Sequence, residues 1–299
     1  LCLRIFFLFV LSIFQLSFAQ TYPTKPVKLV VGFSVGGGTD TVARSVAKKL
    51  SEFWQQPVVI ENKAGADGSI ATEAVSQSTP DGYTLVMVSN AHTITPFQRK
   101  LGYDPIKDFA PVSLIASTPN LLLVHPSLQV KNIKELITLL KSQPGKYSFG
   151  SSGTGTSPYL AMELFKAETS TQINHVPYKG SSQAVVDLIG GHVQLMFGAV
   201  PTLEPHVTSG KLRAIAISSP KRLSAFPDLP TVGETLPGFE AASWYGVLAP
   251  SGVPPALVSK IQMDISSALQ TSEVKNFIIN SGFEVIGNKP KEFAAVIQQ

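Results

Sequence analysis

The sequence predicts an α/β fold in which helices cover both faces of parallel β-sheets, and three observations lead to this prediction. Strand-like and helix-like patterns alternate along the chain, which is how parallel sheets are built. The first strand-like segment, 27–33, is a nearly continuous apolar run, as expected for a strand buried on both faces. Two glycine-rich turns, 32–40 and 150–157, each connect a strand to a helical pattern.

A helix is expected directly after the first turn, because apolar residues recur there with helical spacing, namely Ala43, Val46, Ala47, Leu50 and Phe53. Strands follow at 57–60, 83–88 and 121–124, and the second of them is entered through a Pro-Asp-Gly turn. Asn132 and Glu135 form a capping pair that opens a helix over 133–141.

The alternation continues through the second half of the chain. Strand 147–149 leads through the second turn into a helix that includes Pro158 in its first turn and reaches about residue 167. Further strands are expected at 175–177, 193–197, 212–217 and 244–248. Further helices are expected at 184–189, at 203–209 and at 256–270. Another helical pattern ends at Gly282, and the last one starts at Pro290. The last helical pattern is still in register at Gln299, so the chain is expected to be a truncated copy.

Composition indicates a globular protein. The chain has 299 residues, of which 44% are apolar and 15% are charged, well away from the composition of disordered proteins. This length allows two medium-sized cores. The net charge is +4, but the Lys and Arg residues are scattered without a basic block, so no nucleic-acid partner is expected.

Residues 1–19 have the features of an export signal. Arg4 precedes a mostly apolar run over 5–18, and Ser17-Phe18-Ala19 is a small-x-small pattern, so cleavage is expected near Ala19. The alternative is a membrane anchor, but an anchor needs about 20 apolar residues. Cleavage would remove the single cysteine, Cys2, and with it disulfides and thiol chemistry. The periplasm is therefore the expected location.

The two glycine-rich turns carry the strongest functional signal. A helix N-terminus presents unpaired backbone N–H groups and a positive dipole end, which suits an anion. The predicted ligand-binding residues are Gly37, Gly38, Thr39 and Asp40 from the first turn and Ser151, Gly155 and Thr156 from the second. Because the turns lie far apart in the sequence, they predict two lobes that close on a small acid with two functional groups.

Other interpretations of these motifs fail or stay open. Thr41 stands where a dinucleotide-binding turn needs its last glycine, and no Lys follows the glycines as in a phosphate loop. The turn over 150–153 has the wrong spacing for a nucleophile elbow, and the five histidines show no i, i+4 pair. Neither catalytic residues nor a metal site are therefore expected.

Ser89, His92 and Lys179 are further candidates, and Asp40, His92 and Lys179 each have a structural alternative. Asp40 either contacts the ligand or is a helix-start carboxylate that pairs with Arg44. Ser89 and His92 follow a strand and are expected to line the cleft, although His92 suits a buried or capping role equally well. Lys179, in a third strand-to-helix loop, either adds a positive charge near the anion or is a solvated surface residue.

Several stretches in combination resemble one family. They include Gly36-Gly37-Gly38-Thr39-Asp40 within 30–40, Pro80-Asp81-Gly82-Tyr83 within 80–85, and the segments 61–65, 103–109, 151–156, 175–180 and 229–234. From about Tyr22 to its end, the chain resembles the Bug-type extracytoplasmic solute receptors of tripartite tricarboxylate transporters. Val35 and Tyr159 depart from the family pattern, which usually has Pro and His at these positions.

The resemblance implies a type II periplasmic binding-protein fold with two α/β lobes, a ligand cleft and a two-segment hinge. The lobes are expected at 21–123 plus 243–299 and at 124–242. It also implies a small carboxylate ligand held by backbone amides, hydroxyls and bridging waters, no cofactor, and the membrane subunits of a transporter as partners. Di- and tricarboxylates, acidic amino acids and aromatic acids all remain possible ligands. A ligand-sensing partner of a signalling protein and a periplasmic hydrolase remain as alternative functions.

Overall fold

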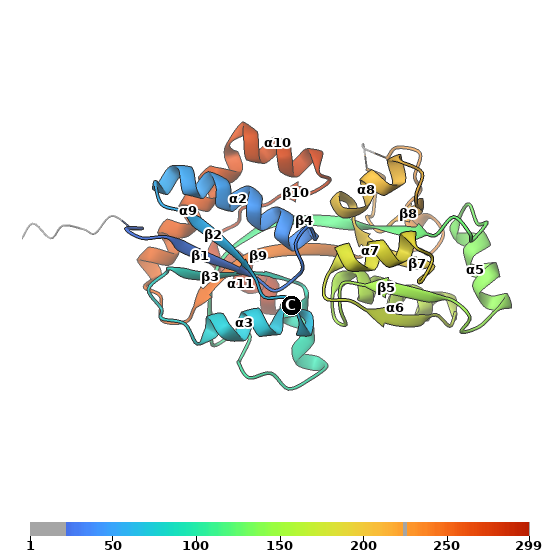
Figure 1. The fold of residues 1–299 in the computed structure, drawn as a ribbon, viewed down its shortest axis with the longest axis horizontal. Coiled ribbons are helices and arrows are strands. Elements are labelled where there is room, and N and C mark those ends of the chain that lie inside the picture. Colours follow the sequence, from blue (N-terminus) through green and yellow to red (C-terminus); the bar gives the residue numbers. More distant parts are fainter. Residues whose placement is uncertain (1–21, 224–225, 299) are drawn as a thin grey trace, which may run out of the picture.

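The computed structural model describes residues 22–223 and 226–298, and it shows two lobes joined at a narrow waist (Figure 1). The predicted export signal, its cleavage site near Ala19 and Cys2 lie outside the described residues. Within the described part of the chain, every helix is too short or too polar to cross a membrane.

The first lobe is built on a mixed sheet. Its strands are β1 (Val27–Val31), β2 (Val58–Asn62), β3 (Thr84–Ser89), β9 (Ala242–Pro250), the first part of β4 (Phe109–Val124) and β10 (Glu284–Val285). The strands β1, β2 and β3 pair in parallel, whereas β9 pairs antiparallel with both β3 and β4. Its helices are α2 (Gly38–Trp54), α3 (Ser69–Ser76), α4 (Ala91–Ile94), α9 (Pro255–Gln270), α10 (Ser272–Asn280) and α11 (Pro290–Gln298), with the short helices η1 (Ala66–Gly68) and η2 (Thr95–Phe97).

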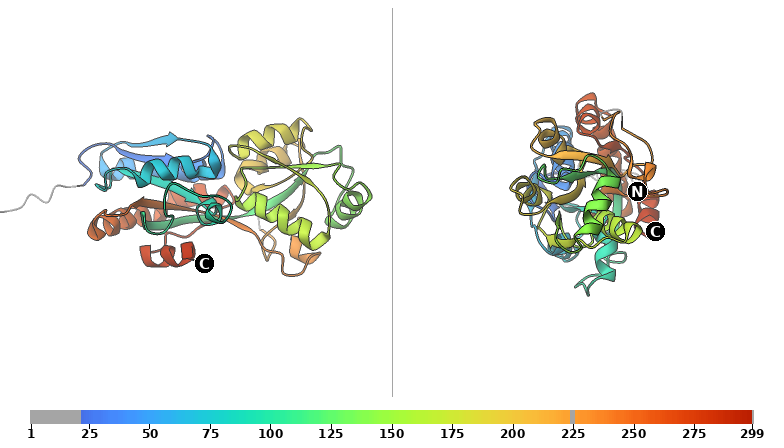
Figure 2. Two further views of the ribbon diagram at one scale, coloured as in Figure 1. Left: turned by 90° about the horizontal axis from the view of Figure 1, so that it is seen from below. Right: turned by 90° about the vertical axis from the view of Figure 1, so that its right-hand side faces the viewer.

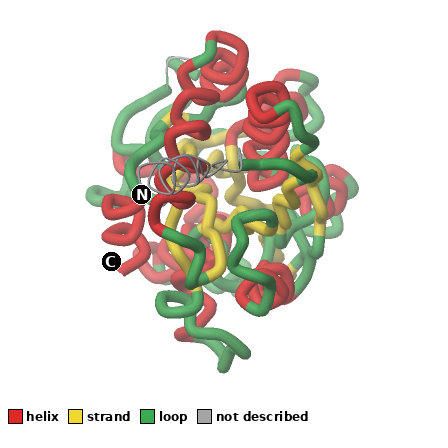
Figure 3. Tube along the Cα trace, turned by 90° about the vertical axis from the view of Figure 1, so that its left-hand side faces the viewer, coloured by secondary structure: helices red, strands yellow, loops and turns green. Residues whose placement is uncertain are grey.

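The second lobe repeats this plan on a smaller scale. Its strands are β5 (Ser148–Ser151), β6 (Asn174–Pro177), β7 (Leu195–Ala199) and β8 (Arg213–Ile217), together with the end of β4. Its helices are α5 (Ile133–Ser142), α6 (Ser157–Thr169), α7 (Ser181–Ile189), α8 (Val200–Thr208) and the short η3 (Val232–Glu234). In the end-on view of the molecule, helices lie around the strands (Figure 3).

Two long strands run between the lobes (Figures 1 and 2). From Phe109 to Pro119, β4 pairs with β9 in the first lobe; from Asn120 to Val124 it pairs with β7, and from Leu121 it also pairs with β8. The strand therefore changes partners at Asn120, which places this residue at the junction of the two lobes.

The α/β class is confirmed, but the expectation of purely parallel sheets is wrong. Antiparallel pairs join β4 and β9 to their neighbours, so both sheets are mixed. The sequence predicted only 121–124 of the sixteen residues of β4. Pro111 and Pro119 and several polar residues interrupt the apolar pattern upstream, although the strand there is mostly buried.

Several local predictions are confirmed. The helix predicted after the first turn lies within α2, and its apolar positions from Ala43 to Leu50 are buried. The capping pair is also present, because the side chain of Asn132 accepts a hydrogen bond from the Glu135 amide at 3.0 Å. Each lobe has its own buried core, with Phe149, Phe165 and Phe197 among the largest buried side chains of the second.

Candidate functional site

Three helices begin at one cavity between the lobes. The helix α2 comes from the first lobe, and α6 and α7 come from the second. Their N-cap residues are Gly37, Thr156 and Gly180, and among the described residues no side chain accepts a capping hydrogen bond at any of the three ends. The first N–H groups of these helices are therefore available to a bound group, and the three positive dipole ends add together.

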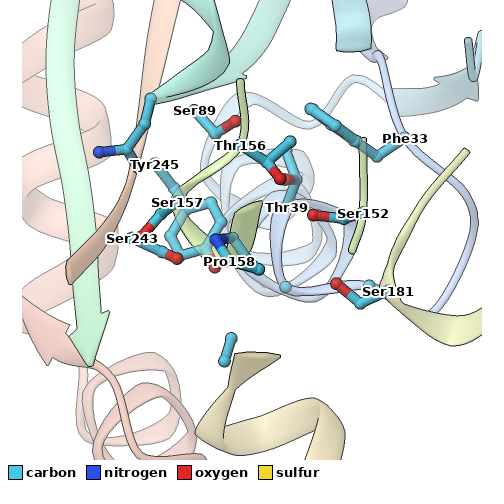
Figure 4. Close-up of a pocket in the computed structure, with 14 residues that line it drawn as sticks. Phe33, Thr39, Ser89, Ser152, Thr156, Ser157, Pro158, Ser181, Ser243 and Tyr245 are labelled. Atoms are coloured by element: carbon cyan, nitrogen blue, oxygen red, sulfur yellow. The ribbon is translucent and has the colours of Figure 1, made fainter. Parts of the chain in front are cut away.

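The lining of this cavity is polar but carries no charged side chain. Fourteen described residues line it, and none of them is Lys, Arg, His, Asp or Glu. Eight carry a hydroxyl group: Thr39, Ser89, Ser152, Thr156, Ser157, Ser181, Ser243 and Tyr245. Figure 4 shows these hydroxyl side chains around the cavity. Such a site can hold an anion through neutral donors and helix ends, without an ion pair.

Tyr245 packs directly against the start of α2. A Cβ atom on Gly38 would lie 2.5 Å from its phenolic oxygen, so glycine is required for this close approach. Tyr245 is only 4% exposed, and burial raises its pKa well above the usual range, although a hydrogen bond with Ser243 acts in the opposite direction. The hydroxyl therefore stays protonated and can act as a hydrogen-bond donor.

The side chain of Asn120 holds the part of the cavity wall that Ser157 and Ser243 form. Its side-chain amide donates to the Ser157 hydroxyl at 3.0 Å and to the Ala241 carbonyl at 3.2 Å. Its carbonyl oxygen accepts a hydrogen bond from the Ser243 hydroxyl at 3.2 Å. This fully buried side chain thus fixes two pocket hydroxyls that come from different lobes. Sequence reasoning missed Asn120, because nothing in its local pattern shows that β4 changes partners there.

Five of the predicted site residues lie together in the cavity lining. These are Gly37, Gly38, Thr39, Ser89 and Thr156. The two glycine-rich turns therefore converge from separate lobes.

The structure does not bring Asp40 to this lining. Its carboxylate accepts hydrogen bonds from the Gly36 amide at 2.9 Å, from Arg44 at 2.8 Å and from Asn62 at 2.8 Å. Burial alone would raise the pKa of Asp40, but these hydrogen bonds outweigh it and hold the pKa below its usual value. The pairing with Arg44 is the structural alternative that the sequence allowed, and it holds the first turn of α2 in place.

Two predicted residues of the second turn are also absent from the lining. Ser151 is completely buried, and its hydroxyl lies 2.7 Å from Nε2 of His175. Its neighbour Ser152 lines the cavity instead, because successive residues at the end of a strand face opposite ways. Gly155 adopts φ +90°, and a Cβ there would meet Gln98 at 2.8 Å, so its contribution is to the turn and to the contact between the lobes.

His92 and Lys179 lie in neighbouring cavities rather than in this one. His92 is 4% exposed, and its Nε2 donates to the Pro105 carbonyl at 2.8 Å while its ring packs against Tyr103 and Phe109. Lys179 lines a second cavity between the lobes, which shares Phe33 and Ser152 with the candidate site.

The burial of His92 makes stability depend on pH. Burial lowers the pKa of His92 to about 4, whereas the unfolded chain has a value near 6.5. Between these values the unfolded state binds more protons, so the free energy of unfolding falls as the pH drops. We expect a loss of about 2 kcal/mol from pH 7 to pH 5 through this residue. Urea unfolding of the wild type and His92→Gln at both pH values tests this, and an equal loss in the variant contradicts it.

The side chains that line the cavity indicate binding rather than proton transfer. The described lining of the cavity contains no Asp, Glu, His, Lys or Arg side chain, and both Ser151 and His175 lie outside it. In the described residues, no three His, Cys, Asp or Glu side chains are grouped so that they could hold a metal ion. Reversible capture of a small anion is the chemistry that this geometry supports.

Comparison with known proteins agrees with this conclusion. The profile of the family described as "Tripartite tricarboxylate transporter family receptor" matches residues 42–299. Protein BugT of Bordetella pertussis is 38% identical over 260 residues, which cover 86% of this chain and 80% of BugT.

Two solved structures with bound acids have the same fold. Rpa4515 of R. palustris with adipate is 36% identical, with a TM-score of 0.90 over 93% of this chain and 94% of that one. MatC of Rhodopseudomonas palustris with bound malate is 32% identical, with a TM-score of 0.88 over 93% of this chain and 96% of that one.

Proposed function

The chain belongs to the tripartite tricarboxylate transporter receptor family and is a periplasmic solute-binding receptor, and we propose that it captures a small organic carboxylate and delivers it to the membrane subunits of such a transporter. The observation that carries this proposal is the convergence of three helix N-termini on one uncharged, hydroxyl-rich cavity between the lobes. Adipate and malate in two related structures support a carboxylate as the ligand class.

The mode of binding follows from the neutral lining. A carboxylate accepts charge-assisted hydrogen bonds from amides and hydroxyls, which are stronger than bonds between neutral groups. No ion pair has to be broken at this cavity when the ligand leaves. In this proposal the ligand enters and leaves unchanged, and the protein has no catalytic step. Cleavage of residues 1–19 near Ala19 is part of the same proposal.

We propose that the lobes 21–123 plus 243–299 and 124–242 open and close around the ligand, with β4 and β9 as the hinge. The loops at the cavity mouth are in contact in the structure: the Ser34 amide donates to the Lys179 carbonyl at 3.3 Å, and the Ser182 hydroxyl donates to the Val35 carbonyl at 2.8 Å. These bonds join the two lobes and favour the closed arrangement.

Replacing Gly180 with alanine is expected to weaken ligand binding about tenfold. The added Cβ would lie 2.0 Å from the Ser34 hydroxyl across the cleft, so the lobes could not approach as closely. The Ser34→Gly change removes that hydroxyl, and the Gly180→Ala, Ser34→Gly double variant should regain most of the affinity. Calorimetry of both variants and of Ser34→Gly alone measures this. Closure is contradicted if Gly180→Ala binds as tightly as the wild type.

A thermal-shift screen followed by calorimetry tests the proposed function. Di- and tricarboxylates, acidic amino acids and aromatic acids form the panel, and a true ligand raises the melting temperature because it binds only the folded protein. We expect binding of one molecule per chain, with the acid recovered unchanged by mass spectrometry. If no acid raises the melting temperature, or if the bound acid is converted, the proposed function is wrong.

A further inference from the structure

A second cavity adjoins the candidate site at Phe33. Phe33 and Ser152 line both cavities, and the second one opens to solvent. It also lies between the lobes, because Asp67 and Arg99 come from the first lobe and Lys179 comes from the second. A ligand held in the candidate site could therefore extend into this space.

The two cavities differ in charge. The candidate site has no charged side chain, whereas the second cavity is lined by Asp67, Arg99 and Lys179. An extended ligand would thus have one end among neutral donors and the other end among charges.

The carboxylate of Asp67 already has an ion-pair partner and a hydrogen-bond donor within the protein. It pairs with Arg99 at 2.8 Å, and it also accepts a hydrogen bond from the Thr154 amide of the second lobe. Burial still raises the pKa of Asp67 above its usual value, outweighing Arg99 and Thr154, which both lower it. Arg99 also donates to the Ala66 carbonyl. Asp67 and Arg99 therefore compensate each other.

Of the three charged residues that line the second cavity, Lys179 is the one outside the Asp67–Arg99 pair. Its side chain is exposed and makes no ion pair with any residue in the described ranges 22–223 and 226–298. The main chain of Lys179 is fixed independently, since its carbonyl accepts from Ser34 and its amide donates to Gln183 at 3.2 Å. The residues that line the second cavity therefore carry one positive charge that no described carboxylate pairs with.

We propose that the second cavity is a subsite for a second anionic group of the ligand, and that Lys179 determines the preference for acids that carry one. This inference rests on the proposed function, because the first carboxylate must occupy the candidate site. A cationic ligand group is not expected in the second cavity, because Arg99 and Lys179 would repel it. The carboxylate of Asp67 is already paired with Arg99. Asp67 is a positioning residue that holds Arg99 against the cavity wall.

The test compares acids that differ only in the charge of one end. Calorimetry is carried out with succinate, glutarate and adipate, each beside its half-amide, in which one carboxylate is replaced by a neutral amide of similar size. The proteins are the wild type, Lys179→Gln and Lys134→Gln. Lys134 is an exposed lysine of α5 in the second lobe and lines none of the cavities described above, so its change matches the loss of net charge alone.

We expect the wild type to bind the best-fitting diacid about tenfold more tightly than its half-amide, as for one charge-assisted hydrogen bond. Lys179→Gln should bring this ratio close to one by weakening only the diacid, and Lys134→Gln should leave the ratio unchanged. Equal affinity of the wild type for a diacid and its half-amide would overturn the subsite while the proposed function stands. The same holds if Lys179→Gln weakens both ligands alike. Failure of the wild type to bind any of these acids would overturn the subsite, whereas the proposed function is overturned only if no acid of the wider screen binds.

Discussion

Gly38→Val is expected to lower ligand affinity about 100-fold or more while the protein remains folded. A Cβ at this position would lie 2.5 Å from the oxygen and 3.1 Å from the ring carbon that carries it in Tyr245. Because Tyr245 is buried, it cannot swing away, so the start of α2 must shift. That shift moves the Gly38 and Thr39 amides from the position where they meet the ligand. Calorimetry with the acid identified in the screen measures the loss.

The control for this prediction is Gly233→Ala in η3. An added Cβ there would make only ordinary contacts, at 3.5 Å from the Phe239 carbonyl and 3.6 Å from Thr231, and it lies outside the cavity lining. We expect wild-type affinity for this variant. Circular dichroism establishes that both variants are folded. If folded Gly38→Val binds like the wild type, the start of α2 does not contact the ligand.

Asn120→Asp is expected to destabilise the protein by about 3 kcal/mol at pH 7 and to weaken binding strongly. The new oxygen would face the Ala241 carbonyl, to which the amide now donates at 3.2 Å, inside a fully buried site. Burial without a cation raises the folded-state pKa of the new carboxyl above the unfolded value near 3.9. The free energy of unfolding of the variant is therefore highest at a pH below that value and falls as the pH rises. A negative charge beside the cavity would also repel a carboxylate ligand.

Urea unfolding between pH 4 and pH 7 measures this effect, and Asn132→Asp is the matched control. Asn132 is an exposed N-cap residue of α5, where Asp and Asn stabilise a helix about equally. We expect its unfolding free energy to stay within about 0.5 kcal/mol of the wild type. If Asn120→Asp loses no more stability at pH 7 than this control, the Asn120 network does not hold the cavity wall.

The parts of the site that could be predicted from the sequence are those that depend on residues close together in the chain. The first turn follows a continuous apolar strand, so its glycines and the start of α2 could be placed from neighbouring residues alone. The Thr156 end of α6 was predictable for the same reason, with Pro158 in the first turn. Such features depend on strand and helix signals that lie within a few residues of each other.

The rest of the site depends on contacts between distant segments. Asn120, Ser243 and Tyr245 lie on β4 and β9, whose antiparallel pairing and change of partner have no local signal in the sequence. Asp40 and Ser151 have the side chains expected of a ligand site, but the fold gives their polar atoms other partners. Residue type and position in a turn predict which groups can bind, whereas through-space packing decides which of them face the cavity.

The central claim is that one ligand contacts helix starts from both lobes at the same time. Amide NMR signals of Thr39 at the start of α2 and of Ser157 at the start of α6 report on the two sides of the cavity. We predict that both signals shift in a titration with the bound acid, and that they do so with the same midpoint at one ligand per chain. A shift of only one of them, or two different midpoints, would contradict the claim that the two turns hold one ligand between them.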